Sequence, residues 1–181
     1  VIIAIICDIS KVTQQVNNSG VPYDSIGVLV NNSALGGGGF VGANVAMVYN
    51  GDSGPPIFVH EFGHSFASLL DEYNVFSNNG TIDNTAHANC YAGQPPAAEW
   101  QGIVSSQDYY QGCTYPNWYR SSPTSVMKDF NAGYFNAVSQ KILNKQIDYY
   151  TGTIQCPTST PEGCYACSYA PGAYCVKDLA D

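Results

Sequence analysis

Two of the three histidines in this chain lie four residues apart, in the segment His60-Glu61-Phe62-Gly63-His64. On a helix, positions i and i+4 project from one face about 6 Å apart, so both imidazoles can reach one metal ion. Glu61 projects to the side of this pair, where a carboxylate can take a proton from the attacking water. The pattern predicts a catalytic Zn²⁺ site in which His60 and His64 are ligands and Glu61 is the general base.

A catalytic zinc site needs a third protein ligand, which this segment does not contain. Asp71 is the nearest following residue with a hard oxygen ligand, and Glu72 competes with it directly. His87 and Glu99 are further candidates if the chain makes a longer excursion. In a straight helix, Asp71 would lie about 16 Å along the axis from the first histidine. We therefore expect the helix to break near Ser68 and the chain to turn back toward the metal.

A second segment that fits a metal site lies about 60 residues further along the chain. Met127, one of only two methionines, follows Pro123 in a short turn before an apolar helical stretch. A methionine in such a turn is typical of the Met-turn beneath the metal of metzincins, and a methionine that fills a gap in the core would give the same pattern. Tyr119 and Tyr134 flank the turn, and either is a candidate to donate a hydrogen bond to the oxyanion.

The residues around the histidine pair resemble the IgA-peptidase-type zinc metallopeptidases, family M64. The pattern of that family is HE-x-GHSFA, then a small residue, Leu and DEY, which residues 60–67 and 69–73 match. The resemblance covers about residues 1–150 and implies a metzincin-like fold and zinc-dependent endopeptidase activity. Ser68 stands where family members often carry Gly, and the tail after residue 151 has no counterpart in the family.

Hydrophobic patterning predicts the elements that must position these residues. We expect strands at 1–7, 23–31 and 40–49, a flexible glycine connector at 35–39, helices from Asp8 or Ser10 to about Val16, at 57–70 and at 134–150, and a long loop over 71–122. The fold class is α+β, with a twisted mixed sheet packed on the active-site helix and the last helix beneath. The third strand is expected to offer an edge to which an extended peptide substrate adds. Residues 1–150 form the catalytic domain, and 151–181 form a cysteine-rich C-terminal tail.

The cysteines indicate an oxidising compartment. Cys90 and Cys113 are expected to close the long loop, and the tail carries Cys156, Cys164, Cys167 and Cys175, either as two disulfides or as a Zn(Cys)4 knuckle. Three N-x-S/T sequons, at Asn17, Asn31 and Asn79, favour disulfides in a secreted glycoprotein. Cys7 is expected to be a small core hydrophobe. The chain opens at Val1 in mid-strand, as a processed product with a secretory segment upstream would.

Composition narrows the function classes. The 6 Lys and Arg against 14 Asp and Glu give a net charge of −8, which argues against nucleic acid or an anionic membrane as partner. No apolar run approaches the length of a membrane span. The alternative to an enzyme is a non-catalytic secreted domain, adhesive or structural, whose metal only stiffens the fold. Such a domain would not need Glu61.

Overall fold

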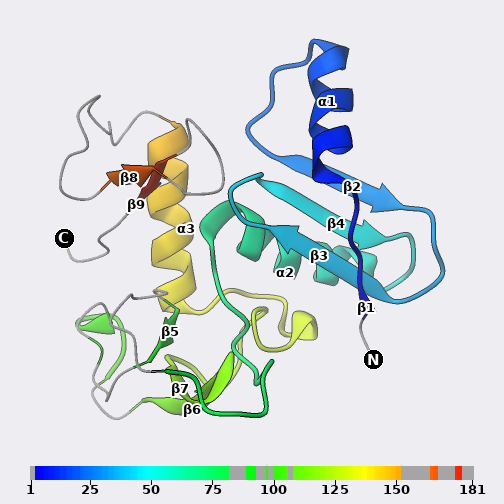
Figure 1. Ribbon diagram of the computed structural model, residues 1–181. Coiled ribbons are helices and arrows are strands. Elements are labelled where there is room, and N and C mark those ends of the chain that lie inside the picture. Colours follow the sequence, from blue (N-terminus) through cyan, green and yellow to red (C-terminus); the bar gives the residue numbers. More distant parts are fainter. Residues whose placement is uncertain are drawn as a thin grey trace.

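The computed structural model describes residues 3–81, 89–92, 97, 100–105, 108–151, 164–166 and 174–176. Its larger sheet has the strand order β1-β3-β4-β2 and is mixed, because β3 runs antiparallel to β4 while the outer pairs are parallel. Its strands are β1 (Ile3–Ala4), β2 (Ile26–Val30), β3 (Gly36–Phe40) and β4 (Val45–Tyr49). The sheet lies against the active-site helix α2 (Gly54–Ala67), as Figure 1 shows, so the α+β arrangement is confirmed.

The expected glycine connector is wrong, because residues 36–39 form most of β3. A Cβ atom added to Gly37 would lie 2.7 Å from Glu61 Oε1, and one added to Gly39 would lie 2.4 Å from the Glu61 carbonyl oxygen. The strand therefore approaches α2 more closely than any side chain would permit. The glycine run is a packing surface for the helix that carries the histidines.

The expected substrate edge is also wrong. The stretch predicted as one strand over 40–49 contains a turn, and its second part, β4, pairs with β3 on one side and β2 on the other. A strand with two partners has no free edge for a peptide. The outer side of β3 is itself paired with β1, where the Ile5 N–H donates to the Gly37 carbonyl at 2.8 Å.

The helices begin and end at residues whose side chains or backbone explain the boundary. Asp8 caps α1 (Ile9–Ser19) by accepting a hydrogen bond from the Lys11 N–H, as its position predicted. Two prolines stand in the first turn of α2, where their missing N–H groups have no helical partner to lose. Asn136 caps α3 (Ala137–Tyr150) by accepting from the Ser139 N–H.

The region predicted as loop over 71–122 contains a second sheet. Its strands, in the order β5-β7-β6, are β5 (Cys90–Tyr91), β6 (Tyr110–Cys113) and β7 (Tyr115–Arg120). Thr114 joins β6 to β7 with a left-handed backbone (φ 62), and Gly112 has φ 91 where the register shifts. Strands this short and irregular carry too few alternating residues to be recognised from patterning.

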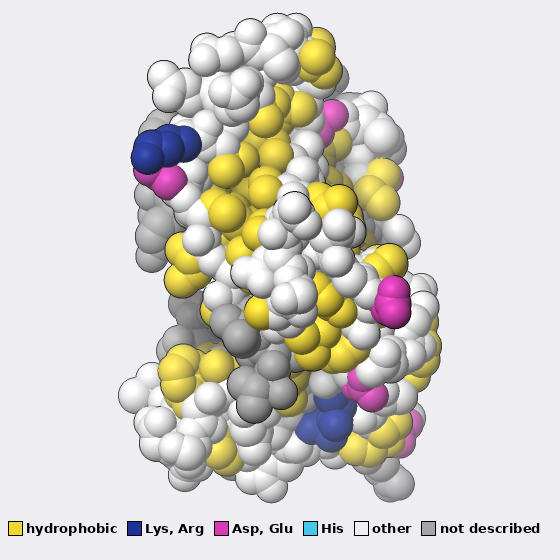
Figure 2. All heavy atoms as spheres, turned by 90° about the vertical axis from the view of Figure 1, so that its right-hand side faces the viewer, with side chains coloured by type: hydrophobic (Ala, Val, Ile, Leu, Met, Phe, Trp, Pro, Cys, Tyr) yellow, Lys and Arg dark blue, Asp and Glu magenta, His cyan; other side chains and the backbone are white. Residues whose placement is uncertain are grey.

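Three further elements complete the described chain. A 3-10 helix, η2 (Phe130–Ala132), precedes α3, and β8 (Cys164–Ala166) pairs antiparallel with β9 (Tyr174–Val176) in the tail. No helix in the described ranges is long and apolar enough to cross a membrane. Figure 2 shows hydrophobic side chains gathered in patches with few charged ones between them, as the low charge content of the sequence leads us to expect.

Candidate metal centre

The two histidines of α2 are oriented by backbone carbonyl groups. His60 Nδ1 lies 2.8 Å from the Val126 carbonyl oxygen, and His64 Nδ1 lies 2.5 Å from the Leu69 carbonyl oxygen. Because a carbonyl can only accept a hydrogen bond, each Nδ1 carries a proton and donates it. In the neutral tautomer each Nε2 then presents a lone pair, and the two Nε2 atoms face each other at 3.0 Å.

Asp71 completes a cluster of three electron-pair donors. Its Oδ1 lies 3.0 Å from His60 Nε2 and 3.2 Å from His64 Nε2, and it is buried without a hydrogen-bond partner. Three acceptor atoms at such distances, shielded at least in part from water, repel one another unless a cation lies between them. In tetrahedral zinc coordination the ligand atoms are about 3.3 Å apart, given bond lengths near 2.0–2.1 Å. The two nitrogens and the oxygen therefore fit one face of a metal coordination sphere.

The pKa values of these groups reflect the same crowding. Burial raises the pKa of Asp71, but the two imidazoles outweigh burial and hold it well below its ordinary value. Burial lowers the pKa of His64, but the Asp71 carboxylate outweighs burial and raises it. Without a metal ion, a proton on His64 beside Asp71 supplies the positive charge that a cation would otherwise provide.

The helix break expected near Ser68 is confirmed, and it brings Asp71 back to the histidines. Ser68 has a left-handed backbone (φ 54, ψ 27), and its N–H donates to the His64 carbonyl at 3.0 Å. The Leu69 N–H donates to the Gly63 carbonyl at 3.2 Å, and the Ser68 bond to His64 is that of an αL-type helix end. Leu69 is 1% exposed and packs beside Met127, which keeps the returning chain in place.

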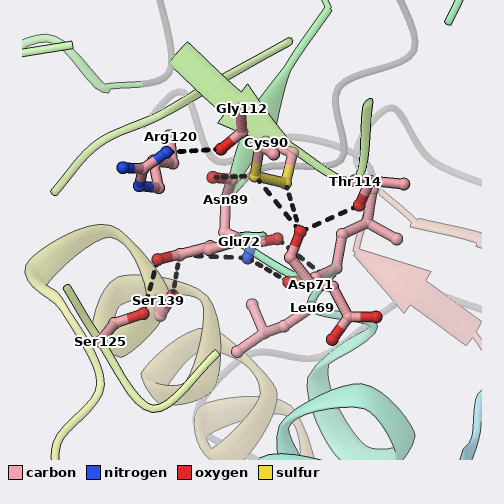
Figure 3. Close-up of a disulfide and its surroundings, with 12 residues drawn as sticks. Leu69, Asp71, Glu72, Asn89, Cys90, Gly112, Thr114, Arg120, Ser125 and Ser139 are labelled. Atoms are coloured by element: carbon pink, nitrogen blue, oxygen red, sulfur yellow. Dashed lines mark hydrogen bonds between the residues drawn. A yellow bond between two sulfur atoms is a disulfide. The ribbon is translucent and has the colours of Figure 1, made fainter. Parts of the chain in front are cut away.

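A disulfide and two polar side chains hold the backbone on either side of the Asp71 carboxylate. Cys90 is bonded to Cys113, as predicted, and both sulfur atoms lie 3.6 Å from the Asp71 carbonyl oxygen (Figure 3). Disulfide sulfurs carry no proton, so these are packing contacts. Thr114 Oγ1 donates to the same oxygen at 3.0 Å, and the Asn89 amide bonds both the N–H and the carbonyl of Leu70.

Glu72, the competing candidate, does not face the histidines. Its side chain is fully buried and accepts hydrogen bonds from Asn89, Ser125 and Asn136. Burial raises its pKa, and these hydrogen bonds oppose the rise. His87 and Glu99 lie outside the described residues, as do Cys156 and Cys167 of the tail.

Glu61 lies beside the cluster, on the side of β3. Its carboxylate is within 4.8 Å of the nearest nitrogens of His60 and His64, and the three residues form a group that could hold a metal ion. Asp71 Oδ1 lies 3.0 and 3.2 Å from the Nε2 atoms of His60 and His64, well within 4.8 Å. The geometry therefore favours Asp71 as the ligand and places Glu61 beside the candidate metal position. Burial raises the pKa of the Glu61 carboxyl group, although the two imidazoles and the nearby Gly39 N–H oppose the rise.

Comparison with known proteins agrees with this geometry. Residues 4–110, which are 107 of the 181 residues, match the family described as IgA Peptidase M64. The chain belongs to the IgA peptidase M64 family. Members of M64 are metallopeptidases, and the matched range contains β2 to β5, the whole of α2 and Asp71. No curated protein matches the chain.

Met127 lies beyond the range matched to M64 but directly beneath the site. It is fully buried, and a Cβ atom added to Gly63 of α2 would lie 2.6 Å from its sulfur. The residue before it, Val126, supplies the carbonyl that orients His60, and the Met127 carbonyl accepts from the Glu72 N–H at 2.9 Å. The turn that contains Met127 thus contacts both α2 and the loop that returns from it.

The tyrosine nearest the M64 histidines is Tyr73, which sequence reasoning did not select. Its ring stacks on His60 with centroids 6.3 Å apart, and its hydroxyl lies near the Asp71 carboxylate. Burial and that carboxylate raise its pKa, so the phenol stays protonated. The structure places Tyr119 in β7, paired with Tyr91 and Gln111. Its position only two residues after Asp71 was the signal that could have identified Tyr73.

Tyr134, the other tyrosine candidate, is 48% exposed and lies after η2. A cavity of about 310 Å³ opens onto the M64 site and is lined by Ile57, His60, Glu61, Tyr73 and residues 128–130. A larger cavity of about 490 Å³ lies between β2 and the first turns of α2 and is mostly apolar. The larger cavity contains none of the site residues, so the smaller one is the candidate substrate site.

Proposed function

We propose that this M64 protein is a secreted zinc-dependent metalloendopeptidase. The observation that supports the proposal most directly is the cluster of His60 Nε2, His64 Nε2 and Asp71 Oδ1, three acceptor atoms within 3.0–3.2 Å of one another. The donor set of two imidazoles and one carboxylate suits Zn²⁺ and leaves a fourth position for water or substrate. His60, His64 and Asp71 would hold the zinc ion.

When bound, zinc would supply Lewis-acid chemistry, by polarising the scissile carbonyl and making water more acidic. Glu61 takes the proton of the attacking water and returns it to the leaving amine. Its position beside β3, with a raised pKa, suits a group that must accept and then release a proton near neutral pH. Glu61 also lines the cavity that we propose to bind substrate.

Tyr73 is the side chain we propose as hydrogen-bond donor to the oxyanion. It lines the cavity together with His60 and Glu61, and its phenol keeps its proton. Tyr119 and Tyr134 do not line that cavity in the part of the chain that the structure describes. An oxyanion donor must lie within hydrogen-bond distance of the developing charge, which favours a residue of the cavity wall.

The substrate we propose is a protein or peptide bound in extended form. The cavity has an apolar wall at Ile57 and Phe130 and polar groups at Lys128 and Asp129, a lining that suits a peptide side chain. The name of the family points to immunoglobulin A, but no residue of the site encodes that preference. The net charge of −8 still argues against nucleic acid as a partner.

Secretion is proposed from the cysteines and the sequons. The Cys90–Cys113 disulfide requires an oxidising compartment, and Asn17, Asn31 and Asn79 are all exposed, as glycan acceptors must be. Expression through a secretory pathway should give a glycoprotein whose mass falls on glycosidase treatment. Mass mapping without reduction should join Cys156, Cys164, Cys167 and Cys175 in two disulfides. Four free thiols holding a second zinc ion would contradict secretion.

The alternative is a secreted domain in which the metal only stabilises the fold. A purely structural site has no use for Glu61 beside the metal or for a cavity that opens onto it. The test is metal analysis of the purified protein together with cleavage of casein, with and without a chelator. We expect one zinc ion per chain and chelator-sensitive cleavage that returns when zinc is added. Bound zinc without cleavage would support the structural alternative.

A further inference from the structure

The fully buried Glu72 side chain connects three segments that are far apart in the sequence. Its Oε1 accepts from Asn89 Nδ2 at 3.2 Å and from Asn136 Nδ2 at 2.8 Å, and its Oε2 accepts from Ser125 Oγ at 2.5 Å. Ser139 Oγ, in the first turn of α3, lies 3.5 Å from Oε1. Figure 3 shows the side chain between Asn89 and the Ser125–Ser139 side, directed away from the Asp71 carboxylate.

Two of these donors belong to segments that also contact the proposed metal ligands or the backbone beside them. Asn89 clamps the backbone of Leu70, directly before Asp71, with bonds of 2.9 and 2.8 Å. Ser125 begins the turn whose next residue, Val126, gives the carbonyl that orients His60. The Glu72 carboxylate therefore connects the loop that carries Asp71 to the turn that fixes the His60 ring.

The backbone of Glu72 makes the same connection a second time. Its N–H donates to the Met127 carbonyl at 2.9 Å, so the turn and the returning loop are joined by a main-chain bond and a side-chain bond. A carboxylate that accepts from three or more neutral donors in a dry interior is held in one orientation, because any rotation leaves a buried donor unsatisfied. That orientation fixes the backbone from which Asp71 projects.

We infer that Glu72 is a positioning residue of the metal centre, which sets Asp71 and His60 in the places that the proposed zinc site requires. The inference rests on the proposed function, since it presumes that Asp71 and His60 are ligands. Partners that orient metal ligands from behind commonly change metal affinity by about 10- to 100-fold when they are removed. Glu72 makes no bond to the metal in this arrangement and acts only through its neighbours.

The test exchanges the carboxylate of Glu72 and the amide of Asn136, which are hydrogen-bonded to each other. Glu72→Gln places two amides face to face, and Asn136→Asp places two carboxylates face to face; each should weaken zinc binding by about 10- to 100-fold. In the double variant the amide is at 72 and the carboxylate at 136, so the hydrogen bond is restored with its direction reversed. Asp at 136 can still cap α3. We expect the double variant to bind zinc within about threefold of the parent, by analogy with additivity tests on contacting residues.

Zinc affinity is measured by competition with a chromophoric chelator, at a temperature at which circular dichroism shows every variant to be folded. The control is Val45→Ala, which removes buried side chain from β4 and lowers stability without touching Glu72. We expect the control to keep parental zinc affinity. If Glu72→Gln does not fold, Ser125→Ala removes one donor and should still weaken zinc binding severalfold.

The outcomes separate the two proposals. A parent protein that binds no zinc overturns the proposed function and this inference with it. A parent that binds zinc, with Glu72→Gln or Ser125→Ala within twofold of it, overturns the positioning role alone. A loss of affinity no greater than in Val45→Ala, or a double variant that does not recover, shows that Glu72 contributes only to general stability.

Discussion

The two halves of the metal centre are built in different ways. His60 and His64 project from α2, a regular helix that packs on the glycines of β3 and on β4. Asp71 projects from an irregular loop, held by the Asn89 amide, the Thr114 hydroxyl and the contact with the disulfide sulfurs. The first half is specified by local sequence, and the second half is specified by contacts between segments distant in the chain.

This difference teaches where the site is robust and where it is fragile. A helix keeps two side chains at i and i+4 in register through its own backbone bonds, so a single distant change disturbs them little. The loop depends on polar contacts from at least three other segments, each of which can fail separately. Substitutions in the two halves should therefore differ in kind, and four of them separate the halves, in order of decreasing effect.

In the helical half, Glu61→Gln should lower kcat/KM by about 10³-fold or more, because it removes the general base. Zinc content should stay at the parental level, since Glu61 is not expected to be a ligand. Inductively coupled plasma mass spectrometry and a peptide cleavage assay on the same sample check both expectations. Native cleavage by this variant would show that the base is another group, and loss of zinc would show that Glu61 is a ligand.

In the loop half, Asp71→Ala should lower zinc affinity by about 100-fold or more, because a ligand is lost. Hydrogen exchange should speed up over residues 68–75 and change little in α2, since the helix does not depend on the carboxylate. A chelator competition assay and exchange mass spectrometry measure the two effects. Unchanged affinity would transfer the ligand role to another residue, such as Glu61 or one of the undescribed residues His87 and Glu99.

The disulfide tests the support of the loop rather than a ligand. Replacing Cys90 and Cys113 together by Ser opens a loop with a sequence separation of 23 and should destabilise the fold by about 3 kcal/mol. Zinc affinity should fall as well, because Asp71 loses the sulfur contacts on its carbonyl side. Denaturant unfolding gives the stability, with Cys7→Ala as control. An equal loss in the control would mean that the disulfide contributes nothing specific.

The smallest effect is expected at Ser68, the residue that joins the helical half of the site to the loop half. Ser68 holds a left-handed backbone that Gly adopts without strain, so Ser68→Gly should stabilise the protein by about 1 kcal/mol. For a chain of this size the melting temperature should rise by about 2–4 °C. Thr13→Gly, in the interior of α1, should do the opposite, because Gly weakens a helix interior. A lower melting temperature for Ser68→Gly would show that the Ser68 side chain supports the turn.

The sequence predicted the helical half of the site well, and the reasons are local. The spacing of His60 and His64 and the prolines at the start of the helix are properties of one short segment. The break at Ser68 followed from a distance argument, since a straight helix could not have brought Asp71 to the histidines. The Cys90–Cys113 pairing was predicted from loop length and is confirmed.

The rest depended on contacts that patterning does not record. The glycines of β3 have little strand propensity, and they form a strand because α2 leaves no room for side chains there. The substrate edge was also misassigned. The strand of residues 40–49 was expected to have a free edge, but β4 is paired with β3 on one side and with β2 on the other. Glu72 looked like a ligand because it is adjacent to Asp71, and only the positions of Asn89, Ser125 and Asn136 show where its carboxylate points.

The chain has only two methionines, and each is fully buried in a different half of the molecule. Met47 lies in β4 and packs with Ile26 and Val45, and Met127 lies in the turn next to Gly63. Peroxide oxidises a buried thioether only when the surrounding structure opens, so the rate at which each becomes a sulfoxide reports local opening of its half. Oxidation of Met47 therefore reports opening of the structure around β4, and oxidation of Met127 reports opening of the turn beneath the proposed metal site.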